Sequence, residues 1–310
     1  MSPTTNERLV KCMKIEALTS EKVESFIAYC KKHKAEVDDS FLYDDDLKGF
    51  KPDAENPTYL ITNSLGEVIA AASLMITEYY KRGKSARFRI FHAEPSDDDC
   101  YSMLMQAVIR HAKGLDKVFL FVPVNHQTLR AHMERLSFAV ERYSFLFVRE
   151  SPEVPEYDLQ KDYEIRAFRA GMDEGIWCDV RNAGFARLQG NDTPITPEMV
   201  TKMIQSEEHI EGGMMILFHH DRPVGIVRGA ADEYEGEPIM NIGPLAILPE
   251  YQGRGLGRIL LRAALRFAKE KSYASTILSV NGENERAKTL YLHEGFRQVE
   301  AVVCYAYRLK

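Results

Sequence analysis

Two hydrophobic periodicities alternate along this chain of 310 residues and predict its strands and helices. Short apolar or alternating runs favour strands, and apolar residues that recur every three or four positions favour helices. In the first half we expect strands over 9–18, 58–63, 67–77, 87–93, 117–124 and 140–149, and helices over 21–34, 100–113 and 127–136. In the second half we expect strands over 163–170, 214–219, 223–231, 239–248, 274–280 and 297–307, and helices over 172–185, 197–207, 259–268 and 285–293.

The two halves repeat the same order of elements at an offset near 155 residues. Pro95 matches Pro249, and Ser137-Phe138 matches Gly295-Phe296. A repeat of this length, with each copy of ordinary domain size, is better explained by duplication than by one continuous domain. Residues 151–162 carry two prolines and several acids with little periodicity, which is typical of a linker. The chain therefore divides into an α/β domain over 1–150, a linker over 151–162 and a second α/β domain over 163–310.

A glycine-rich turn between an apolar strand and a helix carries the most specific chemistry. Gly253, Gly255 and Gly257 stand at alternate positions, so the backbone can take positive φ without a Cβ in the way. The amide groups of this turn lie at a helix N-terminus, where unpaired donors and the helix dipole favour an anion. Arg254 and Arg258 add positive charge. The turn therefore predicts a site for a phosphate or pyrophosphate.

Two motifs in this half resemble those of the GNAT superfamily of N-acetyltransferases. One is Gln252-Gly253-Arg254-Gly255-Leu256-Gly257, which follows Leu245-Ala246-Ile247 and has the form of the acyl-CoA-binding motif. The other is the stretch over 284–296, which fits Asn-x-x-Ala-x-x-Leu-Tyr-x-x-x-Gly-Phe. The resemblance is close over 163–310 and extends to the first half in layout only. It implies two tandem GNAT-like domains, each with a mixed, mostly antiparallel central sheet flanked by helices.

The resemblance also implies roles for individual residues, with acetyl-CoA as cosubstrate and no metal. It assigns the pyrophosphate to the loop of Gln252, Gly253, Arg254, Gly255, Leu256, Gly257 and Arg258. It places the pantetheine arm along Leu245, Ala246 and Ile247, where one backbone N–H polarises the thioester oxygen. Asn284 would contact the cofactor arm. Tyr291 would be the general acid for the leaving sulfur, and its ordinary pKa near 10 keeps it protonated at pH 7.

Some of these residues also have purely structural interpretations. Asn284 would serve as the N-cap of the helix over 285–293, with or without a cofactor contact. Gln252 would serve only the architecture of the loop, and Tyr291 would be a core residue. A glycine loop could also hold a nucleotide such as ATP or NAD, but the strand order and the missing Gly-Lys-Ser/Thr sequence disfavour that ligand.

The first half lacks the corresponding chemistry. Its loop, Glu94-Pro95-Ser96-Asp97-Asp98-Asp99-Cys100, has no glycine and places three carboxylates at a helix N-terminus, where they would repel a pyrophosphate. The counterpart of Tyr291 is Met133, which has no proton to donate. We therefore expect a degenerate domain that does not bind CoA in the usual way and has a structural role, covering the catalytic domain or shaping its acceptor site.

Composition limits the partners and the location. A net charge of −6 argues against a general nucleic-acid binder, and no apolar run approaches the roughly 18 residues of a membrane span. The five cysteines are scattered without a C-x-x-C pair, which indicates reduced, core-filling thiols and a cytoplasmic protein. The acidic stretch 38–51 is interpreted as a solvated loop or short helix. The pair His219-His220 is interpreted as part of a surface turn.

The sequence thus predicts an acetyl-CoA-dependent N-acetyltransferase that acts by direct transfer. The alternative is a non-catalytic acyl-CoA-binding or regulatory protein. The acceptor is a small-molecule amine or a peptide, with the segments 181–193 and 231–237 as candidate lining and an acid in the second segment as candidate base. The chain is expected to be a monomer or a homodimer.

Overall fold

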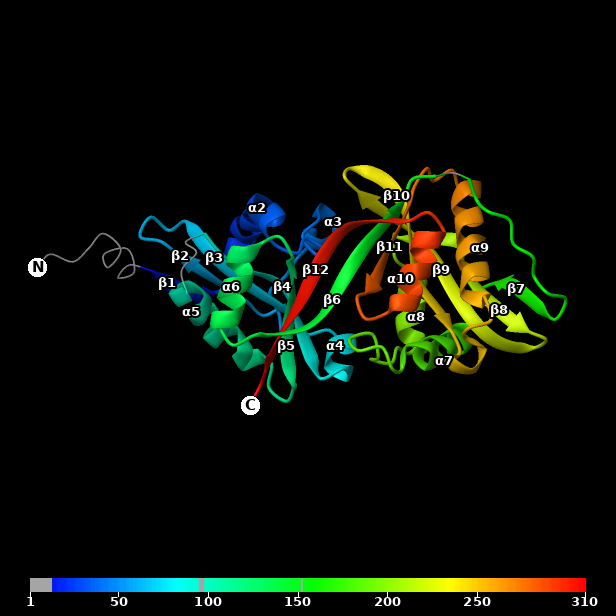
Figure 1. The fold of residues 1–310 in the computed structure, drawn as a ribbon. Coiled ribbons are helices and arrows are strands. Elements are labelled where there is room, and N and C mark those ends of the chain that lie inside the picture. The colour runs from blue at the N-terminus through cyan, green and yellow to red at the C-terminus, as the bar shows by residue number, and fades with distance from the viewer. Residues whose placement is uncertain (1–12, 95–97, 152) are drawn as a thin grey trace, which may run out of the picture. The chain divides into compact units, whose positions relative to one another are not determined.

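The computed structural model describes residues 13–94, 98–151 and 153–310, and its strands and helices form two compact units (Figure 1). The first unit contains the described residues up to Tyr143 together with Val302–Lys310. The second unit is Ser144–Ala301. None of the helices in the described part of the chain has the length and apolarity that a helix needs to cross a bilayer.

The first unit is a mixed sheet with the strand order β1-β2-β3-β4-β5-β12. Only β4 and β5 run parallel, and the other neighbours are antiparallel. Its strands are β1 (Lys14–Ala17), β2 (Thr58–Thr62), β3 (Val68–Met75), β4 (Ser85–Ala93), β5 (Lys117–Pro123) and the last part of β12 (Arg297–Arg308). Its helices are α2 (Val23–His33), α3 (Asp44–Leu47), α4 (Glu78–Arg82), α5 (Asp98–Val108) and α6 (Gln127–Arg135), with 3-10 turns η1 (Ser20–Lys22), η2 (Lys34–Glu36) and η3 (Ile109–His111).

The second unit repeats this plan with the strand order β6-β11-β10-β9-β8-β7. Here β10 and β11 form the parallel pair. Its strands are the last part of β6 (Ala139–Arg149), β7 (Tyr163–Ala167), β8 (His209–His219), β9 (Arg222–Tyr234), β10 (Glu237–Ile247) and β11 (Thr276–Asn281). Its helices are α7 (Glu174–Phe185), α8 (Pro197–Ile204), α9 (Leu256–Glu270) and α10 (Glu285–His293), with the 3-10 turn η4 (Pro249–Tyr251). The predicted mixed, mostly antiparallel architecture of both copies is confirmed.

The last strand of each half pairs inside the unit built mainly by the other half. β12 pairs with β5 from Val302↔Pro123 to Arg308↔Lys117. β6 pairs with β11 from Thr276↔Arg149 to Asn281↔Ser144. Cys304 and Tyr305 of β12 are fully buried in the first unit, so this strand is part of its core. The two copies have therefore exchanged equivalent strands.

This exchange moves the boundaries away from those expected from the sequence. The expected division placed 140–149 with the first domain and the whole last strand with the second. In the structure residues 144–149 belong to the second unit and 302–310 to the first. The physical reason is strand pairing, because a strand belongs to the sheet whose backbone groups it satisfies.

The repeat extends to individual hydrogen bonds. Asn284 caps α10 by accepting from the N–H of Ala287, and His126 caps α6 by accepting from the N–H of Leu129. After each helix, the N–H of Phe296 donates to the carbonyl of Tyr291 and the N–H of Phe138 to that of Met133. Met133 is therefore the structural counterpart of Tyr291, as the sequence comparison predicts.

Helices cover both faces of the sheet in the second unit (Figure 1). α9 buries an apolar stripe that includes Leu260, Leu261, Ala264 and Leu265, and this stripe packs on strands β8–β10. α7 and α8 pack on the other face around the fully buried Trp177. Alternate residues of a strand face opposite sides of a sheet, so the end of β10 contributes to both cores.

Most elements match their predicted ranges, with differences mainly at the ends. β8 begins at His209 rather than at 214, since its pairing with β9 continues across a bulge between His209 and Met214. The first predicted strand, 9–18, is described only from residue 13, and residues 95–97 of the acidic loop lie outside the described residues. Within the described residues Cys30, Cys100, Cys178 and Cys304 are buried and form no disulfide, as expected for core-filling thiols.

Candidate active site

The parallel strands β10 and β11 separate at the end that leads to the glycine loop. Their pairing consists of Met240↔Thr276 and Asn241↔Ile277 and ends there within the described residues. Beyond this point β10 continues along β9, with a bulge between Ile242 and Leu245. The separation leaves an open backbone edge on β10.

Two amides of this open edge point away from β9. The N–H of Leu248 donates to the carbonyl of Val224 on β9. Because neighbouring amides of a strand point in opposite directions, the N–H groups of Ile247 and Leu245 face the open side, whereas that of Ala246 lies in the ladder. Leu245 and Ile247 are therefore the two residues of the predicted trio that offer free donors.

The glycine loop adopts the conformation that glycine permits. Gly253 and Gly255 both have φ of 79°, and a Cβ built on either would meet nothing within 4 Å. Gly255 is the N-cap of α9, so the first amides of that helix open onto the loop. Gly257 differs from the expectation because it is helical. A Cβ there would lie 3.8 Å from both Leu245 and Leu290, which shows that the start of α9 meets β10 and the second half of α10 at this point.

The polar residues around the loop have local partners. The Nε2 of Gln252 donates to the carbonyl of Ile247 at 3.1 Å, so its described contact is architectural. A terminal nitrogen of Arg254 donates to the carbonyl of Glu250 at 2.8 Å, and the guanidinium lies over the Tyr251 ring. Arg254 is exposed, as the sequence interpretation requires of a residue that meets a phosphate.

A buried carboxylate that the sequence interpretation missed holds the first turns of α9. Glu294 is 3% exposed and accepts two hydrogen bonds from Arg262, at 2.7 and 2.9 Å. Its Oε1 also lies 3.0 Å from Nε of Arg258. The backbone carbonyl of Glu294 accepts from Arg149 at 2.8 Å, and burial lowers the pKa of Arg149. The spacing of Arg258 and Arg262 places them on one helix face, which is the only sequence signal for this cluster.

Tyr291 lies on α10 inside the apolar core of the second unit. It is 8% exposed, and its ring packs near those of Phe147 and Phe296. Within the described residues its hydroxyl has no hydrogen-bond partner, and burial raises the pKa of Tyr291 to about 12. The neighbouring Leu290 is the residue that approaches Gly257. The structure thus brings Tyr291, the glycine loop and the open edge of β10 into one region.

Asn284 is a helix N-cap, which is one of the two roles that the sequence left open for it. Its Oδ1 accepts from the N–H of Ala287 at 3.2 Å, which makes it the N-cap of α10. A cofactor contact would use its amide nitrogen or the second lone pair of Oδ1, since the cap takes one lone pair of this oxygen.

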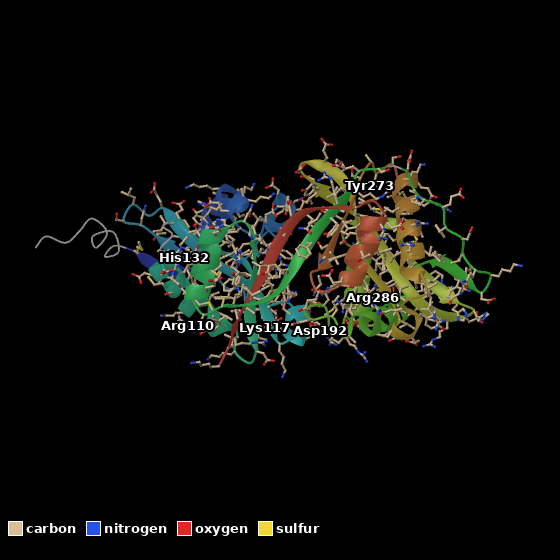
Figure 2. The ribbon with its side chains drawn as sticks, viewed as in Figure 1. Arg110, Lys117, His132, Asp192, Tyr273 and Arg286 are labelled. Atoms are coloured by element: carbon tan, nitrogen blue, oxygen red, sulfur yellow. The ribbon has the colours of Figure 1, made fainter. Side chains whose placement is uncertain are left out.

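The segment 181–193 lies beside the separated strands. Gly184 of α7 packs so closely on β10 that a Cβ would lie 2.9 Å from Cβ of Ala246 and 3.3 Å from the carbonyl of Ile247. The loop that follows α7 carries Asp192 (Figure 2). In this loop the carbonyl of Gln189 accepts a hydrogen bond of 2.9 Å from the side chain of Asn281, which lies at the end of β11. This loop is therefore anchored at the carboxyl end of β11, next to the opening.

The segment 231–237 is the tip of the β9–β10 hairpin. Glu235 and Gly236 form its turn, with φ of 54° and 81°. Asp232 accepts from the side chain of Asn241 at 2.8 Å, and Asn241 is the last residue of β10 paired with β11. Of the acids in this segment, Asp232 has a described link to the point where the strands separate.

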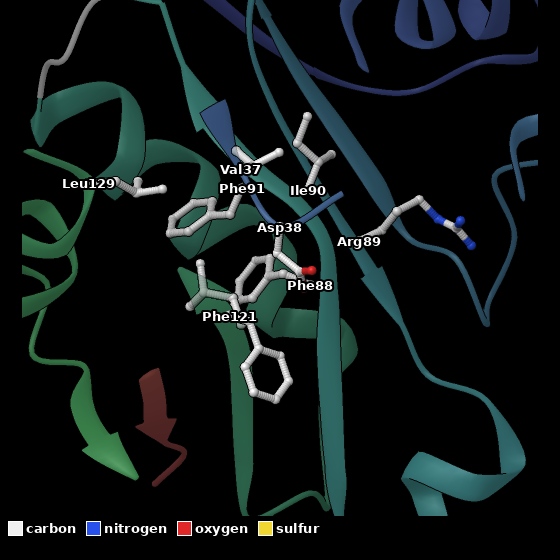
Figure 3. Close-up of a pocket in the computed structure, with 9 residues that line it drawn as sticks. Val37, Asp38, Phe88, Arg89, Ile90, Phe91, Phe121 and Leu129 are labelled. Atoms are coloured by element: carbon white, nitrogen blue, oxygen red, sulfur yellow. The ribbon is translucent and has the colours of Figure 1, made fainter. Parts of the chain in front are cut away.

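The equivalent opening in the first unit is filled. β4 and β5 pair from Ser85↔Lys117 to Arg87↔Phe119 and then separate. The pocket between them has a volume of about 10 Å³, enough for roughly one water molecule. Its lining is Val37, Asp38, Phe88, Arg89, Ile90, Phe91, Leu120, Phe121 and Leu129 (Figure 3).

Asp98 and Asp99 place carboxylates in the first turn of α5. Asp98 accepts from Nε of Arg135 at 2.7 Å and lies 2.6 Å from Nδ1 of His132 on α6 (Figure 2). The hydrogen bond from Arg135, and next that from His132, holds the pKa of Asp98 below its ordinary value. The chain therefore places a negative charge of its own in the first turn of α5, where the helix dipole favours an anion.

His219 and His220 lie at the turn between β8 and β9, as predicted. A third potential metal ligand lies beside them, because Asp162 offers an oxygen within 4.8 Å of one nitrogen of each imidazole. Asp162 and His220 are exposed, and Nδ1 of His219 lies 3.2 Å from the Tyr251 hydroxyl.

Comparison with known sequences places the second half in a family. Residues 191–296 match the acetyltransferase (GNAT) family. A mycothiol acetyltransferase from Acidothermus cellulolyticus is 27% identical over 209 residues, which cover 63% of this chain and 63% of that protein. Another, from Nocardiopsis dassonvillei, is 28% identical over 169 residues, covering 51% and 50%. The chain thus spans between half and 63% of the length of these relatives.

Comparison with solved structures extends the similarity in fold to nearly the whole chain. A GCN5-related N-acetyltransferase from Sphaerobacter thermophilus has a TM-score of 0.67 at 18% identity, over 96% of this chain and 95% of that one. A tandem GNAT protein from the clavulanic acid biosynthesis pathway has a TM-score of 0.65 at 12% identity, over 96% and 98%. Residues 191–296 therefore carry a GNAT-family domain, and the fold of nearly the whole chain is that of tandem GNAT proteins.

Proposed function

We propose that this chain transfers the acetyl group of acetyl-CoA directly to an amine, in the second unit. The observation that carries the proposal is the opening between β10 and β11, with the glycine loop at its end and Tyr291 beside it. In the family, this arrangement binds the cofactor. The first unit has a filled opening and Met133 in place of the acid, which supports a single active copy.

The residues of the second unit fit acetyl-CoA. The open amides of Leu245 and Ile247 would accept the pantetheine arm and polarise the thioester oxygen. The loop of Gly253 and Gly255, free of Cβ atoms and placed at the start of α9, fits the pyrophosphate. When bound, acetyl-CoA supplies the activated acyl group, and no metal is needed for the proposed reaction.

Tyr291 would donate the proton that the departing sulfur needs. The amine nitrogen attacks the carbonyl carbon, the C–S bond breaks, and the phenol proton moves to sulfur. A phenol with a pKa of about 12 is a weaker acid than a thiol of pKa about 8.5, so donation to a free thiolate is uphill. Donation must therefore accompany C–S cleavage in the apolar site, where burial raises the thiol pKa as well.

The acceptor would approach through the region of the α7–α8 loop and the β9–β10 hairpin. Asp232 is our candidate to accept the amine proton, directly or through water, because of its link to Asn241. Since the matched relatives are named mycothiol acetyltransferases, mycothiol-related amines belong in a substrate screen beside other small amines and peptide N-termini.

A turnover screen tests the proposal. Release of free CoA from acetyl-CoA is followed with each amine, and CoA affinity is measured by calorimetry on the same protein. CoA binding with turnover of at least one amine supports the transferase. The alternative, a non-catalytic acyl-CoA-binding or regulatory protein, would show CoA binding and no turnover with any amine class. Preferential binding of ATP or NAD would reject both.

A further inference from the structure

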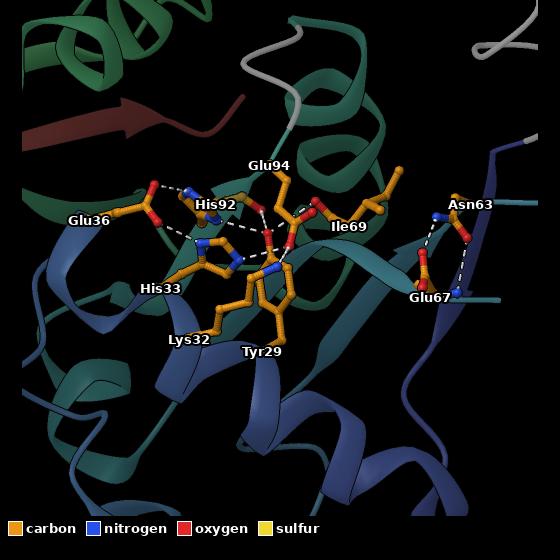
Figure 4. A network of polar contacts seen from close by, with 9 residues as sticks. All are labelled: Tyr29, Lys32, His33, Glu36, Asn63, Glu67, Ile69, His92 and Glu94. Atoms are coloured by element: carbon orange, nitrogen blue, oxygen red, sulfur yellow. Dashed lines mark hydrogen bonds and ion pairs between the residues drawn. The ribbon is translucent and has the colours of Figure 1, made fainter. Parts of the chain in front are cut away.

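Two histidines and two carboxylates gather at the ends of α2 and β4 in the first unit (Figure 4). His33 ends α2, Glu36 ends η2, and His92 lies near the end of β4. His33 and His92 are each 5% exposed, and their ring centroids are 4.4 Å apart. The acetyl transfer proposed for the second unit uses none of these residues.

One nitrogen of each imidazole is held by a neighbouring side chain. The Tyr29 hydroxyl donates to the carbonyl of Ile69 at 3.1 Å and lies 2.8 Å from Nδ1 of His92. With its one proton donated to Ile69, the hydroxyl oxygen can accept a hydrogen bond from Nδ1–H of His92. The Oε1 of Glu94 lies 2.9 Å from Nε2 of His33 and can accept a hydrogen bond from it. In these tautomers both contacts leave the other nitrogen of each ring unprotonated.

The remaining ring nitrogens then present lone pairs to one carboxylate. Oε1 of Glu36 lies 2.7 Å from Nδ1 of His33, and its Oε2 lies 3.4 Å from Nε2 of His92. Two imidazole nitrogens and a carboxylate that face one point form a donor set suited to a cation.

The only ammonium with a described contact to the cluster, that of Lys32, is 2.6 Å from Oε1 of Glu94, on the far side of His33 from Glu36 (Figure 4). This ammonium therefore does not occupy the point that the side chains of His33, His92 and Glu36 share.

We propose that His33 Nδ1, His92 Nε2 and the Glu36 carboxylate bind a Zn²⁺ ion. All three ligand atoms lie within 4.8 Å of one another. Bonds of about 2.0–2.1 Å place two ligands of a tetrahedral zinc roughly 3.4 Å apart, so small side-chain shifts are sufficient. Two imidazoles and one carboxylate suit zinc better than Mg²⁺ or Ca²⁺, which prefer oxygen ligands. The Glu36 side chain is half exposed, so water takes the fourth position.

Tyr29 and Glu94 are the positioning residues of this site. Metal-bound histidines in proteins commonly donate their second N–H to a carboxylate or another oxygen, and loss of such a partner weakens metal binding about 10- to 100-fold. His92 with Tyr29, and His33 with Glu94, have this arrangement. The ion would tie the end of α2 to the end of β4.

Zinc titration of the full chain tests the site. The protein is treated with EDTA, desalted and titrated with Zn²⁺ alone against a chromophoric chelator, and Co²⁺ is added separately to record its visible spectrum. We expect one tight equivalent, a rise in Tm with zinc, and a four- or five-coordinate Co²⁺ spectrum. E36Q and H92Q should weaken zinc binding at least 100-fold, and Y29F about 10-fold.

Two controls separate this site from adventitious binding. H219Q removes a ligand from the Asp162–His219–His220 cluster, and H111Q removes an exposed histidine whose described hydrogen bond is to Tyr59. Both should keep the tight equivalent. The proposal is overturned if E36Q, which changes an exposed side chain and should fold normally, binds zinc as the unmodified chain does. It is equally overturned if the tight equivalent disappears in H219Q. A titration that shows no binding up to about 100 micromolar zinc would also overturn it.

Discussion

Nε of Arg258 lies 3.0 Å from Oε1 of Glu294, so an arginine expected to face the pyrophosphate is held by a buried carboxylate. The exposed fraction of the Glu294 side chain is 1%, against 49% for Arg258. Arg262 completes the cluster from the next turn of α9. The carboxylate therefore positions the start of the helix that would receive the phosphates, and it leaves Arg258 reachable from solvent.

Removal of the Glu294 charge should destabilise the second unit. In E294Q the guanidinium groups of Arg258 and Arg262 lose their anion, and breaking such a buried pair costs roughly 3 kcal/mol. Urea unfolding monitored by circular dichroism measures the loss. The control is E285Q on α10, whose exposed pair with Lys288 should matter by less than about 0.5 kcal/mol. Equal stability of E294Q and E285Q would contradict a structural role for this carboxylate.

Loss of the Tyr291 hydroxyl should affect turnover and leave CoA binding intact. A general acid contributes about 10²- to 10⁴-fold, so kcat of Y291F should fall within that range while the Kd for CoA changes less than about twofold. Y273F, at a tyrosine after α9 (Figure 2), is the matched control. Unchanged turnover in Y291F would remove Tyr291 from the mechanism.

The pKa of Tyr291 predicts the alkaline side of the pH profile. The acid works in its protonated form, and burial raises its pKa to about 12, so it stays protonated well beyond pH 10. We therefore expect kcat with a saturating amine to show no loss from this group between pH 7 and 10. A falling limb below pH 10 that disappears in Y291F would show that the phenol ionises in the ordinary range.

Gly255 should be needed for cofactor affinity beyond its effect on stability. Alanine at φ of 79° costs roughly 1–2 kcal/mol of backbone strain and shifts the amides at the start of α9. We expect G255A to raise the Kd for CoA about tenfold, measured by calorimetry. G114A provides the comparison, because Gly114 has φ of 80° in the first unit and equally open surroundings. A similar change in CoA affinity in both variants would argue against a phosphate site at the loop.

Two glycines of α7 should respond in opposite ways to alanine. At Gly184 the new Cβ would lie 2.9 Å from Cβ of Ala246, so α7 must move off β10 at a cost of about 1–3 kcal/mol. At Gly175 nothing lies within 4 Å, and alanine should stabilise the helix by up to about 1 kcal/mol. Chemical denaturation of both variants measures the difference. Stabilisation by G184A would show that the close approach to β10 is not required.

Local patterns in the sequence predict the elements well because their causes are local. Apolar periodicity defines α9, and the left-handed conformations of Gly253 and Gly255 follow from the residue type. The cap at Asn284 follows from its place before a helix. The sequence also identifies Tyr291 and Met133 as counterparts, since the repeat preserves their spacing from Phe296 and Phe138.

Features that depend on distant residues could not be predicted in this way. Glu294 meets Arg262 across 32 positions, and His33 meets His92 through the packing of α2 on the sheet. The exchange of β6 and β12 leaves the hydrophobic pattern of each strand unchanged, because either sheet offers the same kind of neighbour. Which sheet each strand joins depends on the relative stability of the two complete sheets, and the sequence of one strand does not contain that information.

The exchanged strands set the order in which the protein can be completed during its synthesis. The ribosome makes residues 302–310 only after the whole of the second unit, yet these residues supply the last strand of the first unit's sheet. Until they emerge, β5 has an unpaired edge, and such edges are sites of wrong pairing for nascent chains. A gene cut at residue 151 would likewise encode two fragments, each without a strand of its own sheet. Co-expression of both fragments would be needed to restore the two units.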